Sequence, residues 1–330
     1  MSGATKVGII GLGKYLPEKV LTNADLERLV DTSDEWITER CGIKERRIAR
    51  PDEATSDMAL AAARQAMAQA GITGEDLDLI VVGTISPDTE FPSTACLLQG
   101  ALGCRPIPAF DVAAACSGFL YALTIAESFI KSGKARRALV VAAEKLSAIT
   151  DWTNRNTCVL FGDGAGAAVL SAVESGGILS SYLGTDGKHA ELITQPAGGS
   201  RRPATHETVD KHLHAITMNG TEVFKIAVKT MADAALGAMN VLGVRSADEV
   251  DLIIPHQANI RIIQAVAKRV GVSLEGKVFL NIEKYGNMSA ASTAVALAEA
   301  VESGRVKKGD KVVLVAFGSG LTWGALVIQL

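Results

Sequence analysis

A cysteine, a histidine and an asparagine stand where an apolar, strand-like segment gives way to a helix-like one. Cys116 follows the apolar segment 109–112, His256 follows the segment 252–255, and Asn287 precedes an alanine-rich segment. A cysteine thiolate is the nucleophile that forms thioesters in acyl transfer. We expect the partial positive charge at the start of the next helix to favour the thiolate form of Cys116.

Each of these residue types also has a plainer structural interpretation. A free cysteine is usually a small buried apolar residue, and an asparagine before a helix is usually its N-cap. A lone histidine is more often a hydrogen-bonded structural residue than a catalytic one. The other four cysteines lack a helix-start context and are expected to be structural: Cys41, Cys96, Cys104 and Cys158. The catalytic interpretation therefore requires that the three residues meet.

An internal repeat relates the two halves of the chain. The apolar segment around Leu79 resembles the segment around Leu252, which lies 173 residues later. The helix–glycine–strand segment around Gly133 resembles the one around Gly304, which lies 171 residues later. Patterns of this kind can look alike by chance, but two segments agree in order and in offset. We interpret the chain as two copies of one α/β unit.

The repeat suggests how the three polar residues could come together. Asn287 lies 171 residues after Cys116 and therefore occupies the equivalent corner of the second copy. His256 corresponds to Gly83 and begins the neighbouring corner. If a pseudo-two-fold axis relates the copies, the three side chains converge on one site.

Helix-like and strand-like segments alternate along both copies. This alternation predicts βα units and a largely parallel sheet covered by helices. Ser56 is expected to cap the first long helix and Gly71 to end it. No low-complexity linker separates the copies, so we expect halves 1–175 and 176–330 to share one core. The main expected helices cover 56–69, 93–102 and 258–270, and the main expected strands cover 79–83, 109–112 and 138–143.

Composition excludes several classes of protein. The 330 residues contain 33 Lys and Arg and 36 Asp and Glu, a net charge of −3, which argues against nucleic-acid binding. Hydrophobic residues make up 48%, too many for a disordered chain. The five cysteines form no C-x-x-C pair, which argues against a disulfide framework or a zinc ribbon. No apolar segment reaches the roughly 20 residues that span a membrane, and no signal-peptide pattern is present, so we expect a soluble cytoplasmic protein.

Two other chemistries fit the sequence poorly. The segment 11–16 follows a strand as a dinucleotide fingerprint would, but Leu16 stands where the third glycine belongs. A nicotinamide dehydrogenase is therefore disfavoured. His206, His212 and His214 lie in a polar stretch that would fix metal geometry poorly, so no metal site is expected.

Four motifs in order resemble those of the β-ketoacyl-acyl-carrier-protein synthase III family, which initiates type II fatty acid synthesis. The motifs are DVAAACSGF at 111–119, PHQAN at 255–259, YGNMSAAS at 285–292 and FGSGLTWG at 317–324. The resemblance runs essentially from end to end. It implies an α/β thiolase-like fold, with two βαβαβαββ halves in five αβαβα layers, and a homodimer. The N-terminal half would carry the cysteine, and the C-terminal half the histidine and asparagine.

The resemblance implies a role for each matching residue. Cys116 would take an acyl group from an acyl-CoA primer, for which acetyl-CoA is expected, while the backbone N–H groups of Cys116 and Ser319 hold the oxyanion. His256 and Asn287 would donate hydrogen bonds to the thioester carbonyl of malonyl-acyl-carrier protein. These bonds stabilise the enolate formed as CO2 leaves, and the product is a 3-oxoacyl-acyl-carrier protein. The CoA thioester would be a substrate, and no cofactor is expected.

Contacts to the acyl-CoA also follow from the resemblance. Trp36 and Arg155 match the pair that holds the adenine by stacking and cation–π attraction. Ordinary core packing is the alternative for Trp36. The other matching positions contact the adenine and phosphates, Thr32 and Arg40, and the pantetheine arm, Gly220 and Asn259.

Partner surfaces are implied as well. Arg261, Lys268 and Arg269 fall on one helical face and, with Lys225, resemble the basic patch that receives the acidic carrier protein. A solvated face without a partner is the alternative. Phe91 matches the residue that crosses the dimer interface and closes the partner's acyl pocket, and an aromatic residue there suggests a short primer.

Two departures leave alternatives open. The third glycine-rich motif reads Gly318–Ser319–Gly320 instead of three glycines, which is harmless if only the Ser319 N–H acts. The segment 197–214 is long and charged for the family and lies near the part that shapes the acyl pocket.

One alternative is a paralogous ketosynthase that uses another acyl-CoA primer in secondary metabolism. Another is a non-catalytic module that binds acyl-CoA or carrier protein.

Overall fold

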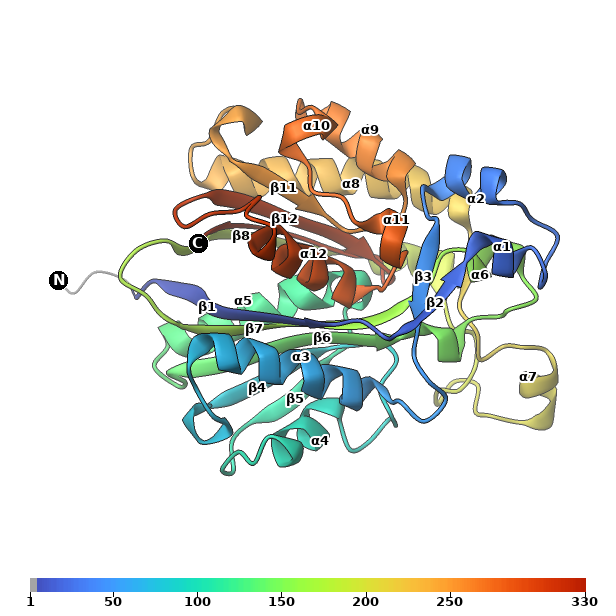
Figure 1. Cartoon of the computed structure of the whole chain (residues 1–330), viewed down its shortest axis with the longest axis horizontal. Coiled ribbons are helices and arrows are strands. Elements are labelled where there is room, and N and C mark those ends of the chain that lie inside the picture. Colours follow the sequence, from blue (N-terminus) through green and yellow to red (C-terminus); the bar gives the residue numbers. More distant parts are fainter. Residues whose placement is uncertain (1–4) are drawn as a thin grey trace.

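Five layers of secondary structure make up the computed structural model, which describes residues 5–330 (Figure 1). Two helices, α5 (Gly118–Lys131) and α12 (Ala290–Glu302), lie between two sheets, and further helices cover the outer face of each sheet. This αβαβα arrangement is the thiolase-like fold that the sequence predicts.

The first sheet is mixed rather than largely parallel. Strand β4 pairs in parallel with β5 and β6, whereas β7 runs antiparallel to both β6 and β1. In spatial order the strands are β1 (Val7–Tyr15), β7 (Asp163–Ala172), β6 (Arg137–Lys145), β4 (Leu79–Gly83) and β5 (Ala109–Val112).

The second sheet is also mixed, so the expectation of a largely parallel sheet is wrong for both halves. Only β11 and β12 pair in parallel. The connection 319–321 is too short for a crossover and forces β13 to run antiparallel to β12. In spatial order the strands are β11 (Leu252–Pro255), β12 (Lys311–Gly318), β13 (Thr322–Gln329) and β8 (Gly177–Thr185).

The order of elements repeats between the halves. The first half runs β1-α3-β4-α4-β5-α5-β6-β7, and the second runs β8-α8-β11-α9-α12-β12-β13. The missing strand of the second half is reduced to a single bridge between Ile253 and Val278. The layer-forming helices are α3 (Thr55–Ala70), α4 (Thr94–Ala101), α5 (Gly118–Lys131), α8 (Gly220–Val241), α9 (Ile260–Val270) and α12 (Ala290–Glu302).

Most of the shorter elements gather at one end of the layers, whereas α10 lies beside α9 (Figure 1). The strands are β2 (Lys19–Thr22), β3 (Glu45–Ile48), β9 (Ile193–Thr194) and β10 (Thr217–Met218). The helices are α1 (Asn23–Leu26), α2 (Asp34–Cys41), α6 (Arg155–Cys158), α7 (His206–Asp210), α10 (Leu274–Lys277) and α11 (Ile282–Tyr285).

Three apolar clusters fill the spaces between the layers. The central cluster combines Leu123 of α5, Leu297 of α12 and Leu314 of β12, so both halves contribute to one core. Separate clusters lie beneath α3 and α4 on one side and beneath α8 and α9 on the other. Both sheets are therefore buried on their two faces, as their long apolar runs require.

Glycines allow unusually close backbone contacts in the central layer. A Cβ at Gly83 would lie 2.8 Å from the backbone of Gly118, and one at Gly118 would lie 3.3 Å from the Cβ of Ala290. On the other side of α12, a Cβ at Gly166 would lie 2.8 Å from the carbonyl carbon of Ala294. The starts of α5 and α12 are thereby held against each other and against the first sheet.

The N-terminal end of α3 differs from the sequence expectation. Ser56 lies inside the helix, where its hydroxyl donates to the Asp88 carboxylate at 2.6 Å. The helix instead follows Ala54, whose N–H donates to the Asp57 carboxylate at 2.8 Å. Gly71 ends the helix in a left-handed conformation, as expected.

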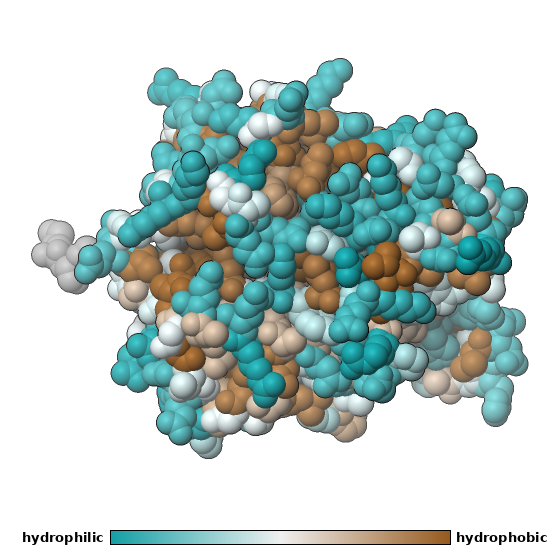
Figure 2. Space-filling model, in the orientation of Figure 1, coloured by the Kyte–Doolittle hydropathy of each residue, from teal (hydrophilic) through white to brown (hydrophobic). Residues whose placement is uncertain are grey.

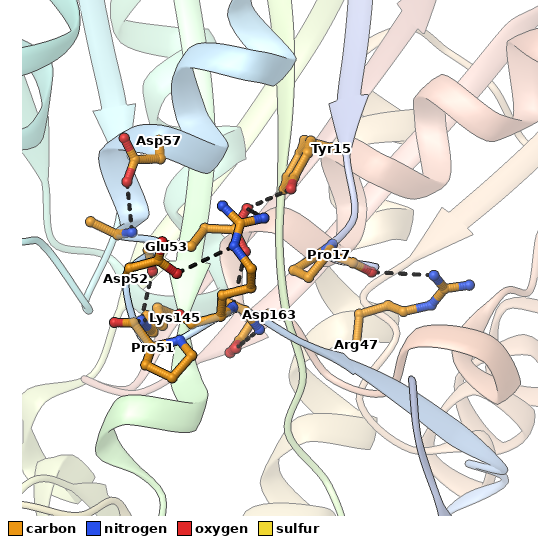
Figure 3. Close-up of polar contacts among 12 residues, drawn as sticks. Tyr15, Pro17, Arg47, Pro51, Asp52, Glu53, Asp57, Lys145 and Asp163 are labelled. Carbon is orange, nitrogen blue, oxygen red and sulfur yellow. Dashed lines mark hydrogen bonds and ion pairs between the residues drawn. The ribbon is translucent and has the colours of Figure 1, made fainter. Parts of the chain in front are cut away.

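A polar cluster fixes the loop before α3 to the ends of β6 and β7 (Figure 3). The Tyr15 hydroxyl donates to Glu53 at 2.5 Å, and the Lys145 ammonium donates to the Glu53 backbone carbonyl at 2.6 Å. Asp163 accepts hydrogen bonds from the Ala49 N–H and from Ser147. The C-terminal end of β6 is therefore held in a defined position.

Polar residues cover much of the surface in Figure 2, with apolar residues gathered on the left. Ile9, Val301, Val306 and Leu330 line a shallow hollow where β1, α12 and the end of the chain meet. Within residues 5–330, none of the helices combines the length and the apolar character needed to cross a bilayer.

We predict that Gly166→Ala destabilises the protein by about 1–3 kcal/mol, because the added methyl overpacks the contact between β7 and α12. The matched control is Gly100→Ala on the exposed side of α4, where a Cβ meets nothing within 4 Å. That change should stabilise by about 0.5–1 kcal/mol, because alanine loses less backbone entropy than glycine in a helix. Chemical denaturation midpoints measure both, and equal stability of the two variants would contradict the close packing.

Candidate active site

Cys116 lies in a single 3-10 turn, 115–117, directly before α5. The preceding Ala115 has a φ of 46°, so the backbone turns sharply into the helix. A Cβ at Gly318 would lie 2.6 Å from the Cys116 nitrogen, which shows how closely the end of β12 approaches this turn. The next residue, Ser319, is held by its hydroxyl, which donates to the Ile193 carbonyl at 2.6 Å.

Asn287 is held by hydrogen bonds on both sides of its backbone. Its N–H donates to the Leu160 carbonyl at 2.8 Å, and its carbonyl accepts from the Gly162 N–H at 3.0 Å. Its side-chain oxygen accepts from the Ser289 N–H at 2.8 Å. This orientation leaves the side-chain NH2 group without an acceptor among residues 5–330, so it is free to donate to a substrate.

His256 follows β11 and is almost fully buried, with 3% of its surface exposed. Its backbone N–H donates to the Val315 carbonyl of β12 at 2.7 Å. Neither ring nitrogen has a hydrogen-bond partner within the described part of the chain, and Nδ1 is buried. Burial lowers the pKa of His256 to about 3, so the imidazole is neutral near neutral pH.

The next residue, Gln257, fixes the turn that carries His256. Its side-chain nitrogen donates to the Pro255 and Phe279 carbonyls, and its side-chain oxygen accepts from the Asn281 and Ile282 N–H groups. Sequence reasoning missed this buried anchor, although it stands inside the PHQAN motif.

The structure brings the three predicted residues to one edge of the central layer. Cys116 touches the end of β12 through Gly318, and β12 pairs with the strand that carries His256. The start of α5 also packs against the start of α12, where a Cβ at Gly118 would lie 3.3 Å from the Cβ of Ala290, three residues after Asn287. The convergence expected from the internal repeat is therefore present in the backbone, while the catalytic roles stay predictions.

The expectation that the helix start makes Cys116 a thiolate stays a prediction, and burial of the thiol opposes it. The residue keeps some accessible surface, but burial of its thiol raises the pKa to about 12. The Glu144 carboxylate acts in the same direction, and the Ser289 hydroxyl lowers the pKa only in part. Desolvation therefore acts against the helix dipole at this thiol.

Two residues near the thiol were missed by sequence reasoning. Glu144 ends the apolar part of β6 and is completely buried. Ser289 precedes α12, is 2% exposed and has a φ of 48°. A carboxylate closing an apolar strand was the available signal, because such residues are seldom buried without a partner.

Comparison with known proteins agrees with this geometry. The family model described as 3-oxoacyl-[acyl-carrier-protein (ACP)] synthase III matches residues 110–187, and the model of its C-terminal part matches residues 243–330. A relative from Caldanaerobacter subterraneus named beta-ketoacyl-[acyl-carrier-protein] synthase III is 56% identical, covering 98% of this chain and 97% of the relative. A relative of the same name from Clostridioides difficile is 53% identical, covering 98% of both chains.

The chain belongs to the β-ketoacyl-acyl-carrier-protein synthase III family. The crystal structure of the Aquifex aeolicus member superposes with a TM-score of 0.91 at 50% identity, covering 98% of this chain and all of that chain. A priming β-ketosynthase of the R1128 polyketide pathway has the same TM-score at 34% identity, covering 99% of this chain and 97% of that one. The predicted family, fold class and enzyme class, an acyltransferase-type condensing enzyme, are confirmed.

The residues that the family resemblance assigns to the adenine site lie close together. The Arg155 guanidinium lies 5.2 Å from the centre of the Trp36 ring, and the Arg40 guanidinium lies 5.0 Å from it. Arg155 also donates to the Asp31 carbonyl at 2.8 Å. Trp36 packs partly against the small apolar cluster around α2, so it serves the core as well.

The other residues that are predicted to contact CoA differ in their surroundings. The Thr32 hydroxyl is buried without a hydrogen-bond partner within residues 5–330. Gly220 begins α8, where a Cβ would lie 3.9 Å from the Met218 side chain. Asn259 caps α9 by accepting from the Arg261 N–H at 2.8 Å, and its side chain also donates to the Arg40 carbonyl. Asn259 therefore has a structural role in addition to the predicted one.

The predicted carrier-protein patch is exposed along α8 and α9, although acidic side chains neutralise part of it. Lys225 pairs with Glu222 at 2.8 Å, and Arg269 lies 3.5 Å from Asp233. Arg261 lies 5.9 Å from the ring of Phe224, and Lys268 is exposed. Arg261 and Lys268 have no ion pair among residues 5–330 and are the stronger candidates for contact with an acidic partner.

Phe91 and the segment 197–214 both lie at the surface. Phe91 is 82% exposed, which is unusual for so large an apolar side chain. The segment closes on itself through the Ala197 N–H, which donates to the Leu213 carbonyl at 2.9 Å, and it carries α7 away from the layers (Figure 1). Its effect on the acyl pocket stays a prediction.

We predict that the Cys116 thiol does not ionise over roughly pH 6 to 9, because its raised pKa keeps the neutral form dominant below about 12. The ultraviolet absorbance of the thiolate, taken as the difference between the wild type and Cys116→Ser, measures this directly. The difference should stay flat over that range and rise only above it. A titration step below about pH 8 would instead support the helix-stabilised thiolate.

Proposed function

We propose that the protein transfers an acetyl group from acetyl-CoA to Cys116 and condenses it with malonyl-acyl-carrier protein. In the first step the sulfur attacks the thioester carbonyl, and the CoA thiolate leaves. The N–H groups of Cys116 and Ser319 hold the oxyanion. The Ser319 N–H has no acceptor within residues 5–330, and Gly318 places it beside the Cys116 turn, which supports this role.

The second step uses His256 and Asn287. Both would donate hydrogen bonds to the malonyl thioester carbonyl and stabilise the enolate formed as CO2 leaves. The observation that carries the proposal is their state: a neutral imidazole without hydrogen-bond partners and a carboxamide oriented by Ser289. Neutral donors can stabilise an enolate without protonating its carbon. That carbon then attacks the acyl-cysteine and gives a 3-oxoacyl-acyl-carrier protein.

The proposal includes partners, assembly and location. The acidic carrier protein would dock on Arg261 and Lys268, the unpaired cations of the exposed patch. A homodimer would cover Phe91, whose exposure in a single chain argues for a partner surface. The enzyme would need no cofactor, since the CoA thioester is a substrate, and it would act in the cytoplasm.

We predict that His256→Ala and Asn287→Ala keep acylation by labelled acetyl-CoA but lose decarboxylation of malonyl-acyl-carrier protein by about 10²–10³-fold, as for loss of an oxyanion donor. Cys116→Ser should block acylation altogether, because it removes the thiol nucleophile. Intact-protein mass spectrometry follows the first half-reaction, and CO2 release follows the second. Labelled acyl-enzyme in Cys116→Ser, or equal loss of both half-reactions in the other variants, would contradict this division of roles.

A panel of acetyl-, branched and medium-chain CoA thioesters tests the primer. We expect the wild type to accept acetyl-CoA best and Phe91→Ala to accept longer primers, because the smaller side chain opens the partner's pocket. Val241→Ala is the control, since it truncates another exposed apolar side chain far along α8. A wild-type preference for longer or branched primers would favour the ketosynthase of secondary metabolism.

A further inference from the structure

Gln257 is a buried carboxamide that directly follows His256, and 1% of its surface is exposed. Its side chain bonds to backbone groups on two separate segments of the chain. The four partners are the carbonyls of Pro255 and Phe279, at 2.7 and 3.2 Å from the side-chain nitrogen, and the N–H groups of Asn281 and Ile282, at 3.1 and 3.2 Å from the side-chain oxygen. Both ends of the amide are therefore fully engaged within the protein.

This set of partners matches a carboxamide and no other side chain of similar size. The nitrogen faces two carbonyl oxygens, and the oxygen faces two N–H groups. A carboxylate at this position could accept from both N–H groups but could donate to neither carbonyl. An apolar side chain of the same length would remove all four bonds from a buried site, which is unfavourable for the polar groups left there.

The segment that Gln257 binds leads directly to Asn287. Helix α11 (Ile282–Tyr285) begins at the second of the two bound N–H groups, and its single turn is closed by the Gly286 N–H, which donates to the Ile282 carbonyl at 2.9 Å. Asn287 is the next residue. One hydrogen-bonded turn is thus all that separates the residue bound by Gln257 from the carboxamide proposed to bind the substrate.

Glu299 of α12 holds the same turn from its other side. One of its carboxylate oxygens accepts from the Asn281 side-chain nitrogen at 2.8 Å, and the other accepts from the Tyr285 hydroxyl at 2.7 Å. Lys14 lies 3.0 Å from Glu299, so the charge of this carboxylate is paired. Because both ends of α11 are fixed in this way, the turn is a rigid link, and Gln257 determines where its first residue lies relative to β11.

We propose that Gln257 is a positioning residue that fixes the separation of His256 and Asn287 and thereby controls formation of the enolate from the malonyl thioester. It binds the turn after β11 on one side and the start of α11 on the other. Two donors that share one carbonyl oxygen must both lie within hydrogen-bond reach of it, so a change in their separation weakens at least one of the bonds. Gln257 acts only through these two residues, because its own amide has no bonding position left for a substrate.

This inference rests on the roles proposed for His256 and Asn287 in the second half-reaction. It predicts a difference between the half-reactions, because the Cys116 turn is held by separate contacts with the end of β12 at Gly318. If Gln257 served only the stability of the fold, its loss would reduce the amount of folded enzyme and weaken both half-reactions alike.

The test compares Gln257→Met with the wild type in both half-reactions. Acylation of Cys116 by labelled acetyl-CoA should stay within about twofold, whereas CO2 release from malonyl-acyl-carrier protein should fall by about 10–10²-fold, as expected when a catalytic group is misplaced by about 1 Å. In the His256→Ala background the further loss caused by Gln257→Met should be smaller, because one of the two groups that it positions is already absent.

Gln99→Met is the matched control. Gln99 of α4 is a carboxamide that likewise donates to two backbone carbonyls, those of Cys104 and Arg105, at 2.8 and 3.0 Å. It closes the turn after α4, outside the proposed active site. This variant should lower the chemical denaturation midpoint but keep both half-reactions at the wild-type rate.

The outcomes separate this inference from the proposed function. If the wild type performs both half-reactions and Gln257→Met keeps CO2 release within about twofold, the positioning role is overturned and the proposed function stands. Equal loss of both half-reactions in Gln257→Met overturns the positioning role too, as does the same selective loss in Gln99→Met. If Gln257→Met does not fold, Gln257→Glu decides by the same criteria, since it keeps the shape of the side chain and the accepting oxygen but loses the donor. A wild type that releases no CO2 from malonyl-acyl-carrier protein would overturn the proposed function itself.

Discussion

The close approach of α5 and α12 is the constraint on which the rest of the structure depends. Gly118 and Ala290 meet at the starts of these helices, and Gly83 and Gly166 let the first sheet pack directly on them. Larger side chains at these points would push the helices apart. Because α5 follows Cys116 and α12 follows Asn287, the separation of these helices sets the distance between the two residues.

Much of the architecture could be predicted from the sequence because the two halves obey the same packing rules. The offset between Gly133 and Gly304 survives in the structure as two left-handed helix ends before equivalent strands β6 and β12. The same offset relates Cys116 to Asn287, which precede the two central helices. Sheet direction could not be obtained this way, because antiparallel pairing of β12 and β13 depends on a short connection that apolar patterning does not report.

The electrostatic state of the site could not be predicted from local sequence. The start of α5 is visible in the sequence and favours a thiolate, but layers from both halves enclose the sulfur and raise its pKa. Glu144 and Ser289 were missed for a related reason. Glu144 is far from Cys116 along the chain and close to it only after β4, β6 and α12 are packed. A polar residue at the end of an apolar strand indicates an unusual environment, but it does not identify the residues that surround it.

The stacking of Arg40 and Arg155 near Trp36 has a consequence for the order of substrates. If adenine binds on the indole as proposed, it must take the place of a cation already attracted to that ring. Loss of that cation–π contact then offsets part of the free energy of nucleotide binding. On the proposed function, free CoA would be held less firmly for that reason, whereas a phosphopantetheine arm, which has no adenine, would leave both arginines in place.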